Sequence, residues 1–176
     1  MTDKKFLNSL ANGKSDVIQI FLNQLGKLEI DYCVIGGLAV NAYAEPVASL
    51  DLDVVLTIGD IEKLLEEISS SKEKFVITKF THSINLQHAD SDLRLQIQTD
   101  ERYQSFINKA SLKKVFGYEM KVASLEDLLK GKIWAYSDEE RRKSKRQKDL
   151  ADIMRLVETY PNLTEFLPEN IKKLIS

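Results

Sequence analysis

The chain has 176 residues, of which 43% are hydrophobic and 30% are charged, a balance typical of one folded globular domain. A net charge of −2 excludes a protein whose whole surface attracts nucleic acid or anionic membranes. The lone cysteine, Cys33, excludes a disulfide framework and indicates a reducing compartment. The polar N-terminus has no apolar signal core, and no apolar run is long enough to span a membrane. We therefore expect a full-length cytoplasmic protein that does not contact membranes.

The first part of the chain predicts helices that lead into a short strand. Residues 4–11 and 16–27 have apolar side chains near helical spacing, and Ser15 stands where it could cap the second helix. Residues 31–35 form a short apolar run typical of a buried strand. After a pair of glycines, residues 37–44 predict a short helix.

The middle of the chain predicts most of a sheet. The strand-like runs are residues 51–58, 75–80, 84–88 and 93–99. Because short polar segments join the last three runs, we expect these to pair antiparallel. Helices are predicted at residues 60–69 and 102–110, and a small hairpin at residues 114–122.

The last part of the chain is predicted to be helical. Residues 125–137 follow the capping residue Ser124, residues 139–160 end before a proline, and a short tail helix covers residues 168–175. The order of elements predicts an α/β (α+β) fold with a mixed, partly antiparallel sheet flanked by helices. We expect residues 1–123 to form the core and residues 124–176 to form a helical region packed on the same domain.

Two aspartates stand at the start of the predicted strand 51–58. In a strand, residues i and i+2 project from the same face, so Asp51 and Asp53 present two carboxylates side by side. Two hard oxygen donors of this kind suit Mg²⁺, which binds through one or two carboxylates, waters and substrate phosphates. The alternative is a solvated strand start with two surface aspartates.

A glycine pair, Gly36 and Gly37, lies between the first strand and the following helix. Glycine allows the backbone to approach a phosphate at such a turn. The alternative is a tight turn without a ligand. A glycine turn followed about fourteen residues later by an acid-headed strand is more restrictive than either feature alone.

The order of an apolar residue, Gly36-Gly37, a spacer and Asp51-Leu-Asp53 resembles the polymerase-beta-type nucleotidyltransferase superfamily. Downstream, the stretch Val122-Ala-Ser-Leu-Glu-Asp-Leu-Leu-Lys-Gly-Lys132, followed by Arg146-Gln-Lys-Asp149 and Asp152, is similar to the end of a bacterial nucleotidyltransferase-like group. Some members of this group are toxins or antitoxins in phage-defence (abortive-infection) and toxin–antitoxin pairs. The likeness covers residues 32–157, which is most of the chain.

The resemblance implies a site for a nucleoside triphosphate (NTP) and Mg²⁺. Gly36, Gly37 and Ser49 would bind the nucleotide. Asp51 and Asp53 would bind Mg²⁺ and take part in catalysis. The acceptor of the nucleotidyl group would be a hydroxyl of RNA, of a protein or of a small molecule.

The chain departs from this family at two positions. The third carboxylate of the family comes from a later strand, where this sequence has Gln96. An amide cannot accept a proton or neutralise a second cation, so two-metal phosphoryl transfer is compromised. Many relatives also have an arginine four residues before the first aspartate, where this chain has Val47.

Lys132 interrupts an apolar stripe of the predicted helix 125–137. A helical wheel places it among Leu125, Leu128, Leu129 and Tyr136. A lysine there either extends along the apolar surface to the rim or faces a polar cleft where an anion or a carboxylate neutralises it. The resemblance favours a cleft, with Lys132 as a catalytic and phosphate-binding residue.

A basic run stands at the start of the last long helix, where six of the eight residues 141–148 are basic. Such a run is usually a solvated helix start, here balanced by neighbouring acids. The alternative is a surface that binds nucleic-acid phosphates or an acidic partner protein, through Arg142, Lys143, Arg146 and Lys148.

These observations support two hypotheses of function. The first is a Mg²⁺-dependent nucleotidyltransferase that moves a nucleotidyl group to a hydroxyl. The second is a catalytically impaired nucleotidyltransferase-fold protein with a binding or regulatory role, for example an antitoxin. Gln96 and Val47 favour the second, and the acidic pair favours the first.

Overall fold

The computed structural model describes residues 1–176 and contains one mixed sheet of seven strands in the order β3-β4-β5-β2-β1-β7-β6. The strands are β1 (Tyr32–Ile35), β2 (Asp51–Leu56), β3 (Phe75–Lys79), β4 (Ser83–His88), β5 (Arg94–Gln98), β6 (Ser111–Val115) and β7 (Tyr118–Val122). β2 pairs in parallel with β5, and β1 with β7, whereas the other neighbours are antiparallel. The predicted mixed, partly antiparallel sheet is therefore confirmed.

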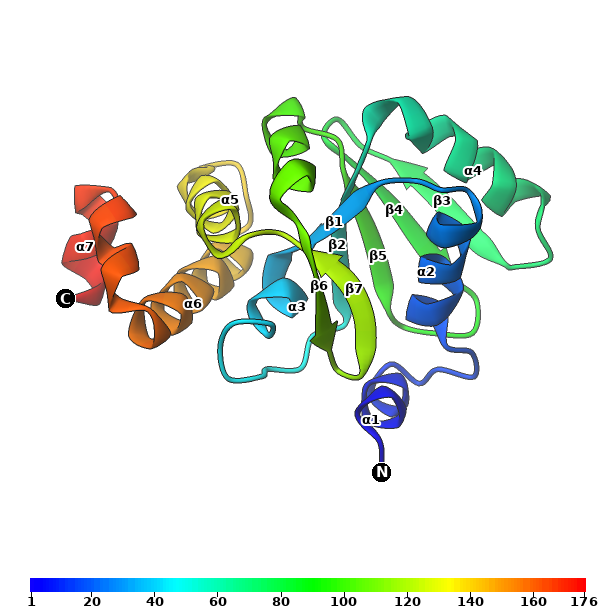
Figure 1. Ribbon diagram of the computed structural model, residues 1–176, viewed down its shortest axis with the longest axis horizontal. Coiled ribbons are helices and arrows are strands. Elements are labelled where there is room, and N and C mark those ends of the chain that lie inside the picture. Colours follow the sequence, from blue (N-terminus) through cyan, green and yellow to red (C-terminus); the bar gives the residue numbers. More distant parts are fainter.

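Helices lie on both sides of this sheet. They are α1 (Asp3–Leu10), α2 (Val17–Lys27), α3 (Gly36–Val40), α4 (Ile61–Ser70), α5 (Leu125–Ser137), α6 (Lys143–Thr159) and α7 (Glu169–Ile175). Short 3₁₀ segments are η1 (Ile58–Asp60), η2 (Glu101–Lys109) and η3 (Pro161–Phe166). Figure 1 shows α5, α6 and α7 together at one side of the sheet and α2 and α4 at the opposite side.

The strand register places Asp53 near the centre of the sheet. Asp53 of β2 stands opposite Ile35 of β1 on one side and Gln96 of β5 on the other. Since β1 ends at Ile35, the glycine that follows lies beside Asp53. The glycine turn and the acidic strand therefore meet although they are separated in sequence.

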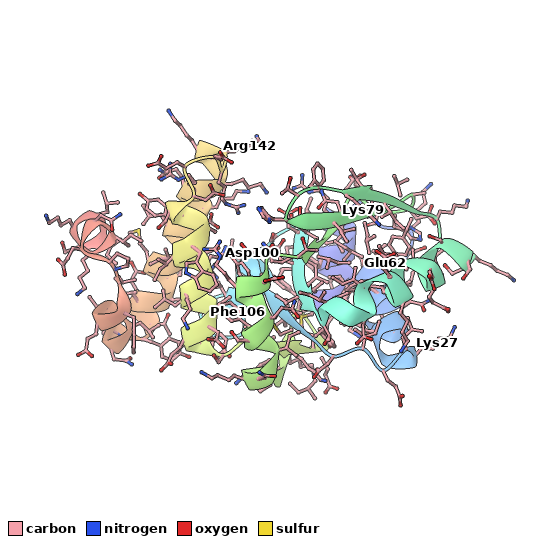
Figure 2. All side chains as sticks on the ribbon, turned by 90° about the horizontal axis from the view of Figure 1, so that it is seen from above. Lys27, Glu62, Lys79, Asp100, Phe106 and Arg142 are labelled. Atoms are coloured by element: carbon pink, nitrogen blue, oxygen red, sulfur yellow. The ribbon has the colours of Figure 1, made fainter.

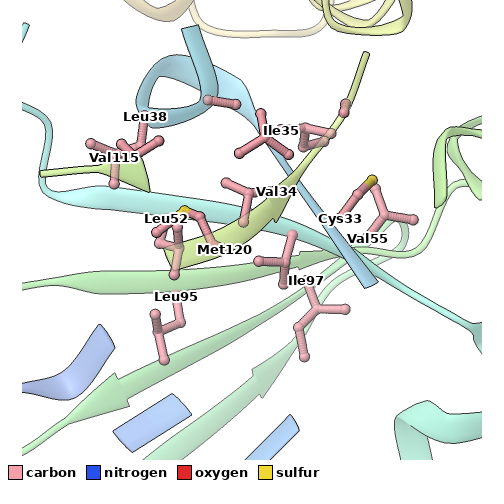
Figure 3. Packing of buried hydrophobic residues seen from close by; sticks show 14 of the residues in the cluster. Cys33, Val34, Ile35, Leu38, Leu52, Val55, Leu95, Ile97, Val115 and Met120 are labelled. Carbon is pink, nitrogen blue, oxygen red and sulfur yellow. The ribbon is translucent and has the colours of Figure 1, made fainter. Parts of the chain in front are cut away.

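One apolar core joins the sheet to the helices, including those of the C-terminal region. It contains 40 buried hydrophobic residues, among them Leu128 of α5 and Ile153 of α6. Figure 3 shows part of this packing, with Cys33, Val55 and Ile97 among the labelled side chains. Cys33 is fully buried, and burial raises the pKa of its thiol to about 12, so it remains protonated.

The 3₁₀ segment η2 connects the sheet to α5 through aromatic packing. Phe106 of η2 stacks on Trp134 of α5 with ring centroids 5.6 Å apart. Figure 2 shows Phe106 between the sheet and the C-terminal helices. This contact fixes the position of α5 and of the side chains that it carries toward the sheet.

Several predicted element limits were wrong, and the helix predicted at residues 102–110 is the 3₁₀ segment η2. α2 is capped by Asp16, whose carboxylate accepts a hydrogen bond from the amide of Gln19, and not by Ser15. α6 begins at Lys143 and not at residue 139, since the backbone turns between the two helices. α3 ends at Val40, four residues before the predicted end.

Two other predicted limits are confirmed. Ser124 caps α5 by accepting a hydrogen bond from the amide of Asp127. The predicted hairpin is present as β6 and β7, joined by Phe116 and Gly117, both with positive φ, although β6 begins at Ser111 and not at residue 114.

Candidate functional site

A cavity of about 660 Å³ lies where α3, β2, β5, α5 and α6 meet. Its volume is within the range of small-molecule sites. Charged side chains of both signs line it: Asp51, Asp53, Asp149 and Asp152, and Arg94, Lys132, Arg141, Lys145, Lys148 and Arg155. The excess of cations over carboxylates favours a ligand with several negative charges.

Asp51 stands at the start of β2 with both carboxylate oxygens in ion pairs. Arg94 donates from Nε to Oδ1 at 2.6 Å, and Lys145 donates from Nζ to Oδ2 at 3.0 Å. Burial by itself would raise the pKa of Asp51, but the hydrogen bonds and charges of Lys145 and Arg94 outweigh it, and the pKa lies below its ordinary value. Asp51 is therefore ionised at neutral pH.

Asp53 faces the same cavity without a direct ion pair. Burial is the largest influence and raises the pKa of its carboxyl to about 6, although the charge of Lys132 acts in the opposite direction. The two aspartates of one strand face thus differ in ionisation behaviour. Asp53 carries a charge at neutral pH that Lys132 and the other surrounding cations do not fully compensate.

Only glycine fits at position 36, because the Asp53 side chain occupies the space that a side chain at this position would need. The φ of Gly36 is +78°, and a Cβ atom at this position would lie 2.2 Å from Oδ2 of Asp53. Both the backbone angle and the contact exclude larger residues. Gly37 has no such constraint, because a Cβ there would meet Oδ2 of Asp152 at 3.6 Å, an ordinary contact distance.

Gly36→Ala is therefore expected to lower the free energy of unfolding by about 1–2 kcal/mol, the cost of a left-handed backbone angle at a residue with a side chain. The clash should also displace the Asp53 carboxylate from the cavity. Urea denaturation measures the first effect. Gly37→Ala is the matched control and should leave the stability within about 0.5 kcal/mol of wild type; equal stability of the two variants would contradict the close approach of Gly36 to Asp53.

Ser49 lines the cavity next to the aspartates, and a hydrogen bond to a neighbouring residue holds it there. Its hydroxyl accepts a hydrogen bond from the backbone amide of Asp51 at 3.2 Å. This bond shapes the chain just before β2. Ser49 thus orients the first aspartate, whereas its predicted role toward a nucleotide stays a prediction.

Lys132 is buried at the centre of a charge cluster. Its ammonium lies 3.1 Å from Oδ1 of Asp149 and 2.8 Å from Oδ2 of Asp152, and its side chain is only 9% exposed. Burial alone would lower the pKa of Lys132, but the two aspartates outweigh it and raise the pKa above its ordinary value. The sequence left two positions for Lys132, the rim of the apolar surface or a polar cleft. In the structure Lys132 lies in the polar cleft, where carboxylates of α6 neutralise it.

Asp149 and Asp152 are themselves neutralised by a second cation each. Arg141 donates from Nε to Oδ2 of Asp149 at 2.7 Å, and Arg155 donates from Nη1 to Oδ1 of Asp152 at 2.8 Å. Sequence reasoning quoted these aspartates for the resemblance without giving them a place in the site. Their spacing of three residues on one helix, which sets both on the same face, was the available signal.

Gln96 occupies the position expected for a third carboxylate. It lies on β5 directly beside Asp53 and lines the cavity. The nearby acids that could replace it point elsewhere: Asp92 accepts a hydrogen bond from Asn12, and Asp100 pairs with Arg102. The site thus has two carboxylates and one amide on adjacent strands.

The donor set fits a metal ion that completes its coordination with substrate. No group of three His, Cys, Asp or Glu side chains is arranged to hold a metal ion. Asp51 and Asp53 alone could therefore hold Mg²⁺ only together with water and phosphate oxygens, which is how Mg²⁺ commonly binds beside nucleotides. A closed metal site made of protein ligands alone is not present.

The basic run of α6 separates into different environments. Arg142 and Lys143 are exposed, and Figure 2 shows Arg142 at the outer end of the helical layer. Arg146 turns inward and donates from Nε to the backbone oxygen of Tyr136 at 2.7 Å. Lys148 lines the cavity. The four predicted residues of the anion-binding strip thus do not form one surface, although three of them remain available to an anion.

Four cationic residues of the site, Arg94, Arg141, Lys145 and Arg155, were missed by sequence reasoning, and two of them pair with Asp51. Lys145 lies within the basic run but was not distinguished from its neighbours, and Arg94 stands at the start of a strand without any motif. Their pairing with Asp51 depends on how α6 and β5 pack beside β2. Helical spacing relative to Asp149 was the one signal that could have placed Lys145 on the cavity side of α6.

Comparison with solved structures shows the fold. The chain is similar to ANT(2'')-Ia in complex with adenylyl-2''-tobramycin, with a TM-score of 0.58 and 15% identity over 90% of this chain and 92% of that one. It is similar to the lincosamide antibiotic adenylyltransferase LnuA bound to lincomycin, with a TM-score of 0.54 and 12% identity over 82% of this chain and 98% of that one. A nucleotidyltransferase-like protein from Paracoccidioides brasiliensis matches with a TM-score of 0.53 and 18% identity over 86% of this chain and 75% of that one.

At these identities the likeness concerns the fold alone. No curated protein matches the chain by sequence. None of the helices is both long and apolar enough to span a membrane. The family model described as "Nucleotidyl transferase AbiEii toxin, Type IV TA system" matches residues 21–175, and the chain therefore belongs to this family of nucleotidyltransferases.

Proposed function

We propose that the protein is a Mg²⁺-dependent nucleotidyltransferase, which binds an NTP in the cavity beside α3 and transfers its nucleotidyl group to a hydroxyl acceptor. The observation that carries the proposal is the pair Asp51 and Asp53, which face a cavity with an excess of cationic side chains. Membership of the AbiEii family and the adenylyltransferase fold of its structural neighbours support the reaction class.

Each residue would have a distinct task. Asp51 and Asp53 would hold the metal ion, which when bound lowers the charge of the reacting phosphate and of the departing pyrophosphate. Gly36 gives Asp53 the room to face the cavity, and Gly37 and Ser49 would stand beside the nucleotide. Lys132 neutralises the carboxylates of α6, which would otherwise repel the phosphates.

The transferase proposal is tested by transfer of label. The purified protein is incubated with each of the four α-labelled NTPs and Mg²⁺ in the presence of cellular RNA or protein. We expect Mg²⁺-dependent labelling that falls by at least about 100-fold in Asp51→Asn and in Asp53→Asn, since each removes one of two metal-binding carboxylates. Asp31→Asn, at the opposite end of β1 from the glycine turn, is the control and should retain wild-type transfer.

A second function is favoured by Gln96 beside Asp53. Because an amide cannot accept the proton of an attacking hydroxyl, the protein could bind nucleotide without efficient transfer and act as a regulatory, antitoxin-like component. Nucleotide binding by calorimetry without transfer to any acceptor would support this function and contradict the first. A family described as a toxin–antitoxin system also leads us to infer a protein partner, for which the exposed neighbours Arg142 and Lys143 offer basic contacts.

A further inference from the structure

The carboxylate of Asp51 has no free oxygen on which a metal ion could bind without competition. Arg94 of β5 contacts Oδ1 at 2.6 Å, and Lys145 of α6 contacts Oδ2 at 3.0 Å. The second aspartate, Asp53, has no such partner within ion-pair distance. The cations are therefore concentrated on one of the two proposed metal ligands.

A divalent cation on Asp51 would compete with these two side chains for the negative charge of one carboxylate. Each oxygen keeps a second lone pair, but the charge of a bound Mg²⁺ repels ammonium and guanidinium groups held on the same carboxylate. Binding of the metal is therefore expected to weaken both ion pairs and to displace the more mobile cation. Lys145 can move away readily, because its flexible side chain is 31% exposed and Asp51 is its one ion-pair partner.

A released Lys145 remains within the cavity. It stands in the first turn of α6 and lines the same space as the glycine turn and the aspartates. The carboxylates of α6 are already neutralised by Lys132, Arg141 and Arg155, so they offer Lys145 no strong replacement. Asp53 would be occupied by the same cation, so a phosphate group in the cavity is the counter-charge that the length and position of Lys145 suit.

We propose that Lys145 is a nucleotide phosphate-binding residue that Asp51 holds in the metal-free protein and that the divalent cation releases to the nucleotide. This inference rests on the proposed metal and nucleotide site. Lys132 has a different environment, since it is buried and held by two aspartates that are themselves fixed by Arg141 and Arg155. Lys145 thus couples metal binding to nucleotide binding.

The test uses two binding measurements. The exchange of Lys145 from Asp51 to the nucleotide phosphate predicts that removal of Lys145 changes the affinity for the metal and the affinity for the nucleotide in opposite directions. Binding of Mn²⁺ alone is followed by the loss of the free-ion signal in electron paramagnetic resonance. Lys145→Met should bind Mn²⁺ about fivefold more tightly than wild type, corresponding to about 1 kcal/mol of removed competition. Binding of an α,β-methylene NTP analogue in the presence of Mn²⁺, measured by calorimetry, should weaken about fivefold or more in the same variant.

Lys121→Met is the matched control, because Lys121 forms a Lys–Asp pair of the same 3.0 Å length with Asp31, outside the cavity. It should leave both affinities at the wild-type value. Lys145→Gln removes the charge but keeps a polar side chain, and it should reproduce both changes in affinity. Agreement between the two variants would exclude poor folding of Lys145→Met as the cause. Unchanged affinities in the Lys145 variants, or two shifts of the same sign, would overturn the exchange.

Asp51→Asn separates this inference from the function on which it rests. If Asp51→Asn abolishes Mn²⁺ binding while the Lys145 variants behave as wild type, the exchange is wrong and the metal site stands. If wild type and Asp51→Asn bind Mn²⁺ equally, or neither binds, the proposed metal site is wrong and the exchange with it.

Discussion

Lys132→Met is expected to lower the free energy of unfolding by about 3–5 kcal/mol, the usual cost of removing one member of a buried ion pair. The ammonium lies between Asp149 and Asp152, and its side chain is almost completely buried. Without it, Arg141 and Arg155 alone face two carboxylates that lie beside Asp53 in the same cavity. Urea denaturation of the metal-free protein measures the loss.

The pH dependence of this loss can be stated with its sign. The pKa of Lys132 is raised in the folded protein, so the contribution of its charge is fully present below the ordinary lysine pKa and is lost only above the raised value. The difference between Lys132→Met and wild type should therefore be the same at pH 7 and pH 9. A loss that disappeared between these two values would indicate a lysine that is neutral in the folded state.

Lys130→Met is the matched control on the same helix. Lys130 is two residues away, its side chain is 55% exposed, and its ion pair with Asp127 is 3.8 Å long. Only the lysine is exposed, since the Asp127 side chain is 6% exposed, but a contact of this length to a solvated ammonium contributes little, so the stability should remain within about 1 kcal/mol of wild type. Comparable losses in both variants would show that the helix itself, and not the buried cluster, is sensitive to substitution.

The sequence predicted those parts of the site that depend on local spacing. Alternation along β2 set Asp51 and Asp53 on one face, and a helical wheel set Lys132 among apolar residues and left a cleft as one of two positions. Both arguments use the geometry of a single element, which neighbouring elements change little. The antiparallel strands β3, β4 and β5 were predicted for the same reason, because short connections permit few pairings.

The partners of these side chains could not be predicted from the sequence. Lys145 contacts Asp51 across 94 positions of sequence, and the contact exists because the tertiary fold brings the first turn of α6 beside the start of β2. The predicted start of α6 was wrong because the acidic and basic residues before Lys143 are all compatible with a helix. In the structure these residues form the turn that connects α5 to α6. Tertiary packing decides between such equal local choices.

Asp53→Asn is expected to make the metal-free protein more stable, by up to about 3 kcal/mol at pH 8. Burial raises the pKa of this carboxyl to about 6 from 3.8, so the folded state binds more protons than the unfolded state between these values. Stability therefore falls as the pH rises through this window and stays reduced above it. Asparagine has a similar shape and no charge, so the variant avoids this loss.

Asp51→Asn should have the opposite effect, although the two residues share one strand face. The pKa of Asp51 lies below its ordinary value because Lys145 and Arg94 outweigh the effect of burial. Its charge therefore stabilises the fold above the ordinary pKa of an aspartate, and this contribution is lost as the pH falls through the lowered value. At pH 8 Asp51→Asn should be less stable than wild type.

Urea denaturation in the presence of a chelator, at pH 4 and pH 8, measures both effects. The Asp53 variant should exceed wild type at pH 8 and approach it at pH 4, whereas the Asp51 variant should fall below wild type at pH 8. An Asp53→Asn protein no more stable than wild type at pH 8 would mean that Lys132 compensates the Asp53 carboxylate fully. If both variants change stability in the predicted directions, the Asp53 carboxylate destabilises the folded protein, and a bound cation can offset this loss of stability.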